Sequence, residues 1–342
     1  MTGRAPSASA MIREAGSCGA AAARLLNARG AISALARTID LARAPVAVIC
    51  GRGSSGHAGV HLRYLIETRL GLPVSMTAPS VVTALNRPLK LEGALFIVIS
   101  QSGASPDLIA TTRMARAAGA QTLALINAEG SALADSAEHV LELLAGPEVA
   151  VAATKSVTSS MVAGTLLVAT LAADTRLLAA LERLPARLDS AYGCDWSKLV
   201  PVLAGAPSAC ITGRGYGLGP AREIALKLAE MLRIPALGYS AAELLHGPRA
   251  ALSTETPVLG LRLCDQTGPD VDRLATKLRG EGIAITTCGG PAGDLPWIGD
   301  DDPVTDAIAM LVPAYRLIEA AARAKGYDPD HPPHLSKVTR TL

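Results

Sequence analysis

The sequence predicts an α/β protein of two tandem doubly wound domains, each with a parallel sheet covered by helices on both faces. The main support is a repeat. VICGRG at 48–53 and CITGRG at 210–215 each join an apolar strand to a glycine turn, at an offset close to half of the 342-residue chain. Short apolar runs also alternate with helical segments in both halves. Because ligands bind at the carboxyl ends of such strands, the repeat also indicates where chemistry can take place.

The first half has the continuous apolar runs that are typical of strands buried on both faces of a sheet. The expected strands cover residues 46–50, 73–77, 94–100, 121–127 and 139–143, and the helices between them cover 57–70 and 106–118. An alanine-rich helix near 17–42 precedes these strands, and long helices near 153–174 and 176–190 follow them. We therefore expect an N-terminal helical segment over 1–45 and a first domain over 46–195.

The second half repeats this alternation. The expected strands cover 208–212, 235–239, 256–263 and 283–288, and the helices cover 218–233, 269–279 and 304–325. This pattern predicts a second domain over 196–326. The last segment, 327–342, contains three prolines and lacks helical periodicity, so we expect an extended tail that covers the active site.

Composition excludes several classes of protein. Lys and Arg total 32 against 30 Asp and Glu, no basic run forms, and only 3% of residues are aromatic, so a nucleic-acid partner is not expected. The longest apolar stretch, 161–173, has about 13 residues, fewer than the ~18 needed to span a membrane. The N-terminus carries charges and no apolar signal segment, which predicts a cytoplasmic location. Six cysteines without CxxC spacing are interpreted as small buried hydrophobes, so we expect no metal site or disulfide.

The first glycine turn matches GxGxxG at 51–56, the dinucleotide fingerprint. That fingerprint also needs a carboxylate at the end of the next strand, and 73–77 has none, so NAD binding is not favoured. The alternative is a phosphate or sugar site formed by Gly53, Ser54 and Ser55 at the start of the following helix. Simple helix capping by these serines is equally natural.

A second hydroxyl-rich turn favours the phosphate interpretation. It follows the strand at 94–100 and offers Ser100, Gln101, Ser102 and Ser105. Two such turns at adjacent strand ends predict a cup for a small phosphorylated molecule. The segment 145–155, which includes Ala152 and Ala153, is a possible third wall through backbone amides at a helix start, and a loop capped by Thr154 is the alternative.

Charged side chains in the second half are candidates for proton transfer. Glu223, Lys227 and Glu230 share one face of a predicted helix, and this spacing alone favours a solvent-exposed salt-bridged face over a catalytic one. A carboxylate beside an ammonium can, however, move a proton while it holds charge on a substrate. His246 stands directly before a Gly-Pro turn, where it is either a structural residue or an acid–base group.

Five motifs in family order give a resemblance over nearly the whole chain. They are ISQSG at 99–103, AGPEVAVAATK at 145–155, EIALKLAE at 223–230, AELLHGP at 242–248 and HLSKVT at 334–339. The chain resembles the double-SIS (sugar isomerase) family, in particular the isomerase half of glucosamine-6-phosphate synthase and the type II glucosamine-6-phosphate deaminases. The resemblance implies two tandem flavodoxin-like SIS domains and chemistry without a metal or an organic cofactor.

The resemblance also implies roles for individual residues. Residues of the two serine turns bind the phosphate and the sugar hydroxyls. Glu230 moves a proton between C1 and C2, and Lys227 stabilises the charge that develops. His246 opens the sugar ring from the adjacent subunit, which implies a homodimer. Lys337 matches the tail lysine that forms an imine with the ketose in the synthases.

Three departures from the synthase pattern affect the expected substrate. The turn Cys50-Gly51-Arg52-Gly53-Ser54-Ser55 resembles the deaminase form, Ala104 replaces an acidic residue, and Ala153 replaces a serine. The expected activity is deamination of glucosamine 6-phosphate to fructose 6-phosphate and ammonia. Glutamine-dependent synthesis is not expected of this chain, because its first strand starts near residue 46 and leaves no room for a glutaminase domain.

Several other activities remain open. Within the enzyme class they are deamination of another amino-sugar phosphate, deglycation, simple isomerisation and a synthase-like isomerase module. A phosphosugar sensor without turnover is the alternative outside that class. The joint presence of Glu230, Lys227 and His246 argues against a sensor, which needs only the serine cup.

Overall fold

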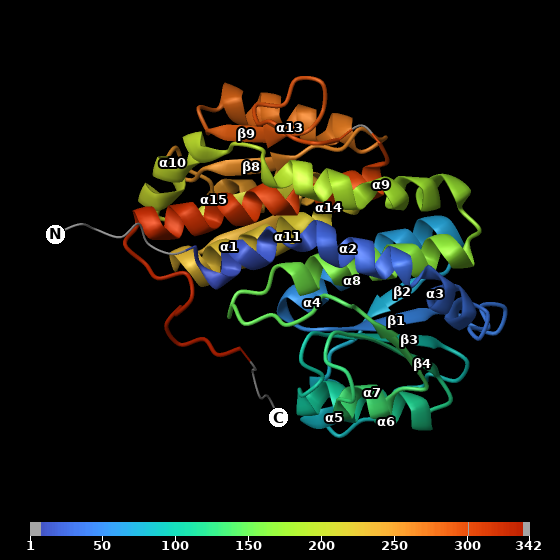
Figure 1. Ribbon diagram of the computed structural model, residues 1–342. Coiled ribbons are helices and arrows are strands. Elements are labelled where there is room, and N and C mark those ends of the chain that lie inside the picture. The colour runs from blue at the N-terminus through green and yellow to red at the C-terminus, as the bar shows by residue number, and fades with distance from the viewer. Residues whose placement is uncertain (1–7, 300, 338–342) are drawn as a thin grey trace.

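The computed structural model describes residues 8–299 and 301–337, and it confirms two parallel sheets (Figure 1). The first sheet has the order β2-β1-β3-β4-β5 and the second has the order β7-β6-β8-β9. The first-sheet strands are β1 (Ala47–Cys50), β2 (Val74–Met76), β3 (Leu95–Ser100), β4 (Gln121–Ile126) and β5 (His139–Glu142). The second-sheet strands are β6 (Ala209–Gly213), β7 (Ala236–Ser240), β8 (Val258–Leu261) and β9 (Ile285–Cys288).

A layer of helices lies between the two sheets (Figure 1). In the first half the helices are α1 (Ala10–Ala15), α2 (Cys18–Asn27), α3 (Arg29–Ala36), α4 (Gly53–Leu65), α5 (Ser80–Thr83), α6 (Pro106–Ala117), α7 (Ala132–Ser136), α8 (Lys155–Leu171) and α9 (Thr175–Tyr192). In the second half they are α10 (Val200–Gly205), α11 (Leu218–Leu232), α12 (Ala241–Leu245), α13 (Gly268–Gly280), α14 (Pro303–Ala309) and α15 (Leu311–Ala324). No described helix is both long and apolar enough to cross a membrane.

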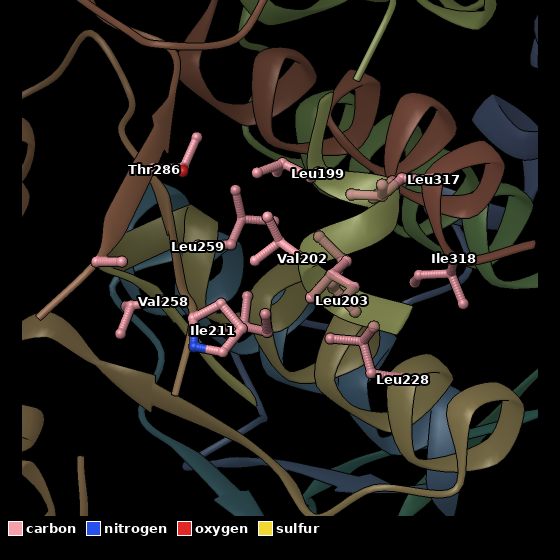
Figure 2. A pocket seen from close by; sticks show the side chains of 14 residues that line it. Leu199, Val202, Leu203, Ile211, Leu228, Val258, Leu259, Thr286, Leu317 and Ile318 are labelled. Atoms are coloured by element: carbon pink, nitrogen blue, oxygen red, sulfur yellow. The ribbon is translucent and has the colours of Figure 1, made fainter. Parts of the chain in front are cut away.

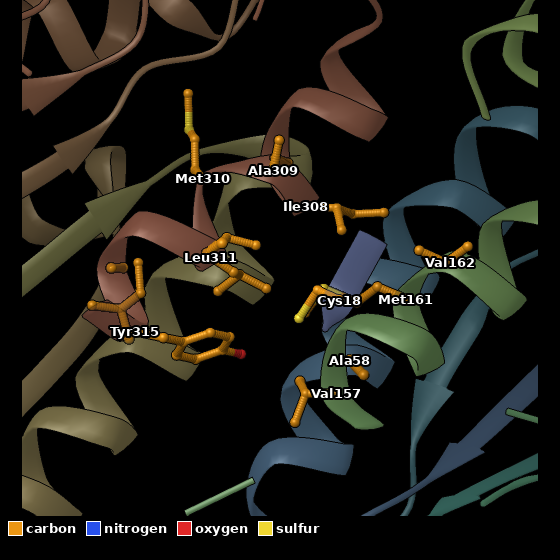
Figure 3. Packing of buried hydrophobic residues seen from close by; sticks show 14 of the residues in the cluster. Cys18, Ala58, Val157, Met161, Val162, Ile308, Ala309, Met310, Leu311 and Tyr315 are labelled. Carbon is orange, nitrogen blue, oxygen red and sulfur yellow. The ribbon is translucent and has the colours of Figure 1, made fainter. Parts of the chain in front are cut away.

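Helices from both halves share one hydrophobic core in this middle layer. Tyr315 of α15 is fully buried and projects its ring toward Cys18 of α2 and Val157 of α8 (Figure 3). The same cluster contains Ile97 of the first sheet and Ile211 of the second. The two sheets are therefore joined by continuous apolar packing, which fixes the position of α4 relative to α11.

Some predicted elements differ from the observed ones. The N-terminal helix expected near 17–42 is three short helices beginning at Ala10, and the helix expected over 304–325 is divided at Met310 into α14 and α15. α4 begins at Gly53 rather than near residue 57, so both predicted serines lie in its first turn. Cys264 is exposed, although the other five cysteines are buried as predicted.

An apolar cavity of about 120 Å³ lies between the second sheet and α10, α11 and α15 (Figure 2). Leu203, Ile211 and Leu228 contribute to its walls, and Thr286 contributes the one hydroxyl-bearing side chain among its lining residues. Leu228 belongs to α11, the helix that also carries Lys227 and Glu230. One side of that helix therefore borders an apolar cavity.

Candidate active site

Two serine turns lie side by side at the carboxyl edge of the first sheet. The chain passes from β1 to β2 on one side and returns to β3 on the other, so β1 and β3 are neighbours at a topological switch point. Ligands of open α/β sheets bind in the crevice at such a point. The predicted cup therefore occupies the position that this sheet topology favours for a ligand.

The turn after β1 brings the backbone into position for an anion. Gly53 adopts a left-handed φ of +51°, which glycine tolerates without strain, and it starts α4. Ser54 and Ser55 are half-buried in the first helical turn. The N–H groups at such a helix start have no intrahelical acceptor and attract negative charge.

The turn after β3 is stabilised by its own side chains. Ser100 is buried, and its Oγ accepts a hydrogen bond from Gly103 N at 3.1 Å. Ser105 is the N-cap residue of α6, and its side chain makes no capping bond within that helix. Gln101 and Ser102 are half-buried between them. Ser100 therefore shapes the turn, together with Ser102, whose Oγ accepts from Ala104 N at 3.4 Å.

Arg52 joins the two turns. Its guanidinium, half-exposed, pairs with the buried carboxylate of Asp107 in the first turn of α6. Asp107 also accepts from Leu108 N at 2.9 Å. This ion pair links the start of α4 to the start of α6. No role for Arg52 was predicted from the sequence, although it is a basic residue between two glycines.

Glu148 occupies the third predicted wall. Its Oε1 accepts hydrogen bonds from the backbone N–H groups of Thr154 and Ser156, both at 3.0 Å, and its Oε2 accepts from Ser156 Oγ at 2.5 Å. Glu148 thus caps α8, and Thr154, which had been considered as the cap, makes no side-chain capping bond. These two amides are consequently committed to Glu148, while Ala152 is buried and Ala153 half-buried in the same loop.

The charged stripe of α11 is buried, which excludes the solvent-exposed face that its spacing had favoured. The side chains of Glu223 and Lys227 are 0% and 1% exposed, and Glu230 is 21% exposed. Lys227 Nζ lies 2.5 Å from Glu230 Oε2 and 3.5 Å from Glu223 Oε1. Burial by itself lowers the pKa of Lys227, but the two carboxylates more than offset it, so this pKa is raised. Lys227 therefore carries a fixed positive charge beside a partly accessible carboxylate.

Glu223 connects this stripe to the first serine turn across the two domains. Its Oε1 accepts from Ser54 Oγ at 3.0 Å and its Oε2 lies 3.1 Å from His57 Nδ1. From the sequence, Glu223 was expected on the charged face of α11 without a role of its own, and His57 was not expected at the site. The signal for His57 was its spacing, because it follows Ser54 by three residues and so lies on the same face of α4.

Lys337 places the tail on the loop of Glu148. Its Nζ donates to Glu148 Oε2 at 3.2 Å and to Ala150 O at 2.6 Å. Burial raises the pKa of Glu148, but the charge of Lys337 and the bonds from Ser156 and Thr154 outweigh it, so the pKa is lowered. Residues 338–342 of the predicted tail lie outside the described residues.

His246 is exposed after α12. Within the described part of the chain, no hydrogen bond or ion pair joins it to Glu230 or Lys227. The chain thus links the first serine turn to Lys227 and Glu230 through Glu223, and no bond among its described residues joins His246 to this stripe. The arrangement can bind an anion at one end and move a proton at the other.

Comparison with known proteins identifies the family of this chain. The SIS domain pattern matches residues 40–170 and 202–289, which include both glycine turns and the stripe of α11. The chain belongs to the SIS domain family. Two SIS-type regions in one chain agree with the tandem fold, and they confirm the family suggested by the motifs.

Relatives of this SIS protein include enzymes of greater length. It is 34% identical over 312 residues to the glutamine–fructose-6-phosphate aminotransferase (isomerizing) of Symbiobacterium thermophilum, a match covering 83% of this chain and 50% of the relative. The enzyme of the same name from Methanothermobacter thermautotrophicus is 33% identical over 299 residues, with the same coverage. The chain thus spans about half the length of these relatives.

Solved structures share the whole fold. A protein from Silicibacter pomeroyi assigned as a phosphosugar isomerase is 35% identical, with a TM-score of 0.88 and coverage of 94% of this chain and 100% of that one. The glucosamine-6-phosphate deaminase of Thermotoga maritima has a TM-score of 0.79 at 22% identity, with coverage of 97% and 100%. At that lower identity the likeness concerns the fold alone.

Proposed function

We propose that this protein is a phosphosugar isomerase that releases ammonia, converting glucosamine 6-phosphate and water to fructose 6-phosphate and ammonia. The observation that carries this proposal is the Lys227–Glu230 pair at 2.5 Å, held by a buried carboxylate that also bonds Ser54 of the serine cup. The cup fits a phosphate, and the pair fits proton transfer between neighbouring carbons. Membership of the SIS family and relatives named as isomerising enzymes support the class of reaction.

The chemistry follows from the positions of these groups. With the phosphate on the serine turns, Glu230 takes the proton from C2 of the open-chain sugar and returns it to C1, and a second proton passes from the amino nitrogen to the C1 oxygen. These transfers leave a hydroxyl on C1 and an imine on C2. The ammonium of Lys227 stabilises the negative charge that develops on the C1 oxygen. Water then adds to the imine carbon, and ammonia leaves as the ketone forms. Glu230 suits this role because it is the accessible member of the buried stripe.

Ring opening precedes these steps and needs a further acid–base group. We assign it to His246 of the partner subunit in a homodimer, because His246 of the same chain is exposed and makes no contact with the stripe among the described residues. Mixing inactive E230Q and H246A subunits tests this assignment. Mixed dimers regain one complete site each, so activity should return to about a quarter of the wild-type value, whereas no recovery would contradict it.

The deaminase direction is supported by the GRGSS form of the first turn, which resembles the type II deaminases. The competing candidate is the reverse direction, amination of fructose 6-phosphate as part of a longer aminotransferase, and the 34% identity to such an enzyme favours it. The two are separated by following ammonia release and sugar-phosphate isomerisation with purified protein. Ammonia release from glucosamine 6-phosphate, abolished in E230Q, supports the deaminase, while interconversion of fructose 6-phosphate and its aldose isomer without any ammonia release supports the competitor.

A further inference from the structure

The carboxylate of Glu223 belongs to α11 of the second domain, but it is contacted by side chains of α4 in the first. It is fully buried on α11, yet two of its three polar partners come from α4: Ser54 Oγ at 3.0 Å and His57 Nδ1 at 3.1 Å. Its third partner is Lys227 Nζ at 3.5 Å. Because an ionised carboxylate only accepts hydrogen bonds, the contact with Glu223 requires His57 to carry its proton on Nδ1. The first domain therefore supplies the donors that hold this second-domain carboxylate.

The distances around Lys227 are unequal. Its ammonium lies 2.5 Å from Glu230 and 3.5 Å from Glu223, although both carboxylates are on its own helix. A carboxylate with no other donor on Oε2 is free to turn both oxygens toward the ammonium and shorten the longer contact. In the structure His57 Nδ1 lies on Oε2 and Ser54 Oγ donates to Oε1, so such a turn would have to break the His57 contact. The ammonium lies beside Glu230.

We infer that His57 is a positioning residue of the active site, which acts on the reaction through Glu223 and Lys227. Its Nδ1–H bond keeps Glu223 away from Lys227 and so keeps the ammonium of Lys227 at Glu230, where the substrate's charge develops. This inference rests on the proposed function. It adds His57, a first-domain residue one turn beyond the phosphate cup, to the second-domain residues that carry out the proposed reaction.

The close packing between α4 and α11 explains why His57 of α4 can hold Glu223 of α11 in place. At Gly219, one turn before Glu223, an added Cβ would lie 2.9 Å from the backbone of His57 and His61, so the helices cross at backbone contact. Gly53 lies near Leu226 at the other end of the crossing. The side chain of His57 is 23% exposed and lies at the edge of this contact. Its imidazole therefore has little freedom to move from Glu223.

Three variants at residue 57 separate positioning from a bond that only stabilises the fold. H57N keeps a donor where Nδ1 stood, H57Q has its donor further out where Nε2 stood, and H57L has none. We expect H57L and H57Q to lower kcat about 10- to 100-fold with KM changed less than about threefold, and H57N to stay within about threefold of wild type. Equal kcat values in H57N and H57L, or a loss confined to KM or to thermal stability, would overturn the inference.

A measurement without turnover makes the inference independent of the proposed reaction. The ammonium signal of Lys227 in ¹⁵N-lysine NMR, assigned by its disappearance in K227M, should shift in H57L and keep its wild-type position in H57N. The same position in all three proteins would overturn the inference. If wild-type protein turns over no sugar phosphate, the proposed function has failed, and this signal alone decides the role of His57.

Discussion

A methyl group at Gly219 should separate the first serine turn from Lys227 and Glu230. In Gly219→Ala the added Cβ would lie 2.9 Å from His57 O, His61 N and His61 Cβ. Ordinary van der Waals contacts begin near 3.4 Å, and the neighbours here are mostly backbone, which cannot turn away as a side chain can. The helices α4 and α11 must therefore move apart by at least several tenths of an ångström.

The expected change in the free energy of unfolding combines two opposing contributions. Overpacking of a tight contact costs about 1–3 kcal/mol, and the better helix propensity of alanine offsets about 1 kcal/mol of it. With backbone on the receiving side we expect a net loss of about 1–2 kcal/mol in the free energy of unfolding. The effect on activity should be larger, because a shift approaching 1 Å between substrate-binding and reacting groups lowers the rate about 100-fold.

Gly280 provides the matched control. It ends α13, and nothing lies within 4 Å of an added Cβ. Gly280→Ala should therefore keep wild-type activity and stability or gain slightly. Thermal unfolding and ammonia release from glucosamine 6-phosphate measure both variants. Wild-type turnover in Gly219→Ala, together with an unfolding temperature no lower than that of Gly280→Ala, would refute the argument that this close crossing positions the site.

Three further outcomes are expected. Complete burial lowers the pKa of His61 to about 4, so the unfolded chain binds the imidazole proton more tightly than the folded chain does. The resulting contribution to the free energy of unfolding, roughly 3 kcal/mol, is present above about pH 6.5 and is lost as the pH falls through 4. H61Q should therefore show a flatter acid unfolding profile than the wild type. Lys337→Met removes both bonds that hold the tail to the loop of Glu148, so chymotrypsin should cleave near Leu335 about tenfold faster, and unchanged cleavage would show that other contacts hold the tail. Thr286→Val replaces the hydroxyl at the apolar cavity with a methyl group and should raise the unfolding temperature by a few degrees without changing kcat; a lower unfolding temperature would show that the hydroxyl has a partner.

The strands were predictable because they are buried on both faces. Such strands consist of continuous apolar residues, and the observed β3 (Leu95–Ser100) and β4 (Gln121–Ile126) lie within one residue of the expected ranges. The two serine turns were predictable for a related reason, since the residues after parallel strands meet at one edge of a sheet. Breaks such as the one at Met310 were not predictable, because apolar periodicity continues across them.

The sequence by itself thus determined the two-sheet fold, the serine turns and the shared face of Glu223, Lys227 and Glu230. Tertiary structure decided that this face is buried, because the cover over it comes from α4, a helix of the other domain. It also decided that Glu148 caps α8 and accepts a hydrogen bond from Lys337, and that His57 contacts Glu223. The contacts of Glu223 with α4 and of Glu148 with Lys337 join residues separated by 166 to 189 positions, so no local pattern encodes them. They exist because the packing of the middle helices places distant donors against buried carboxylates that require them.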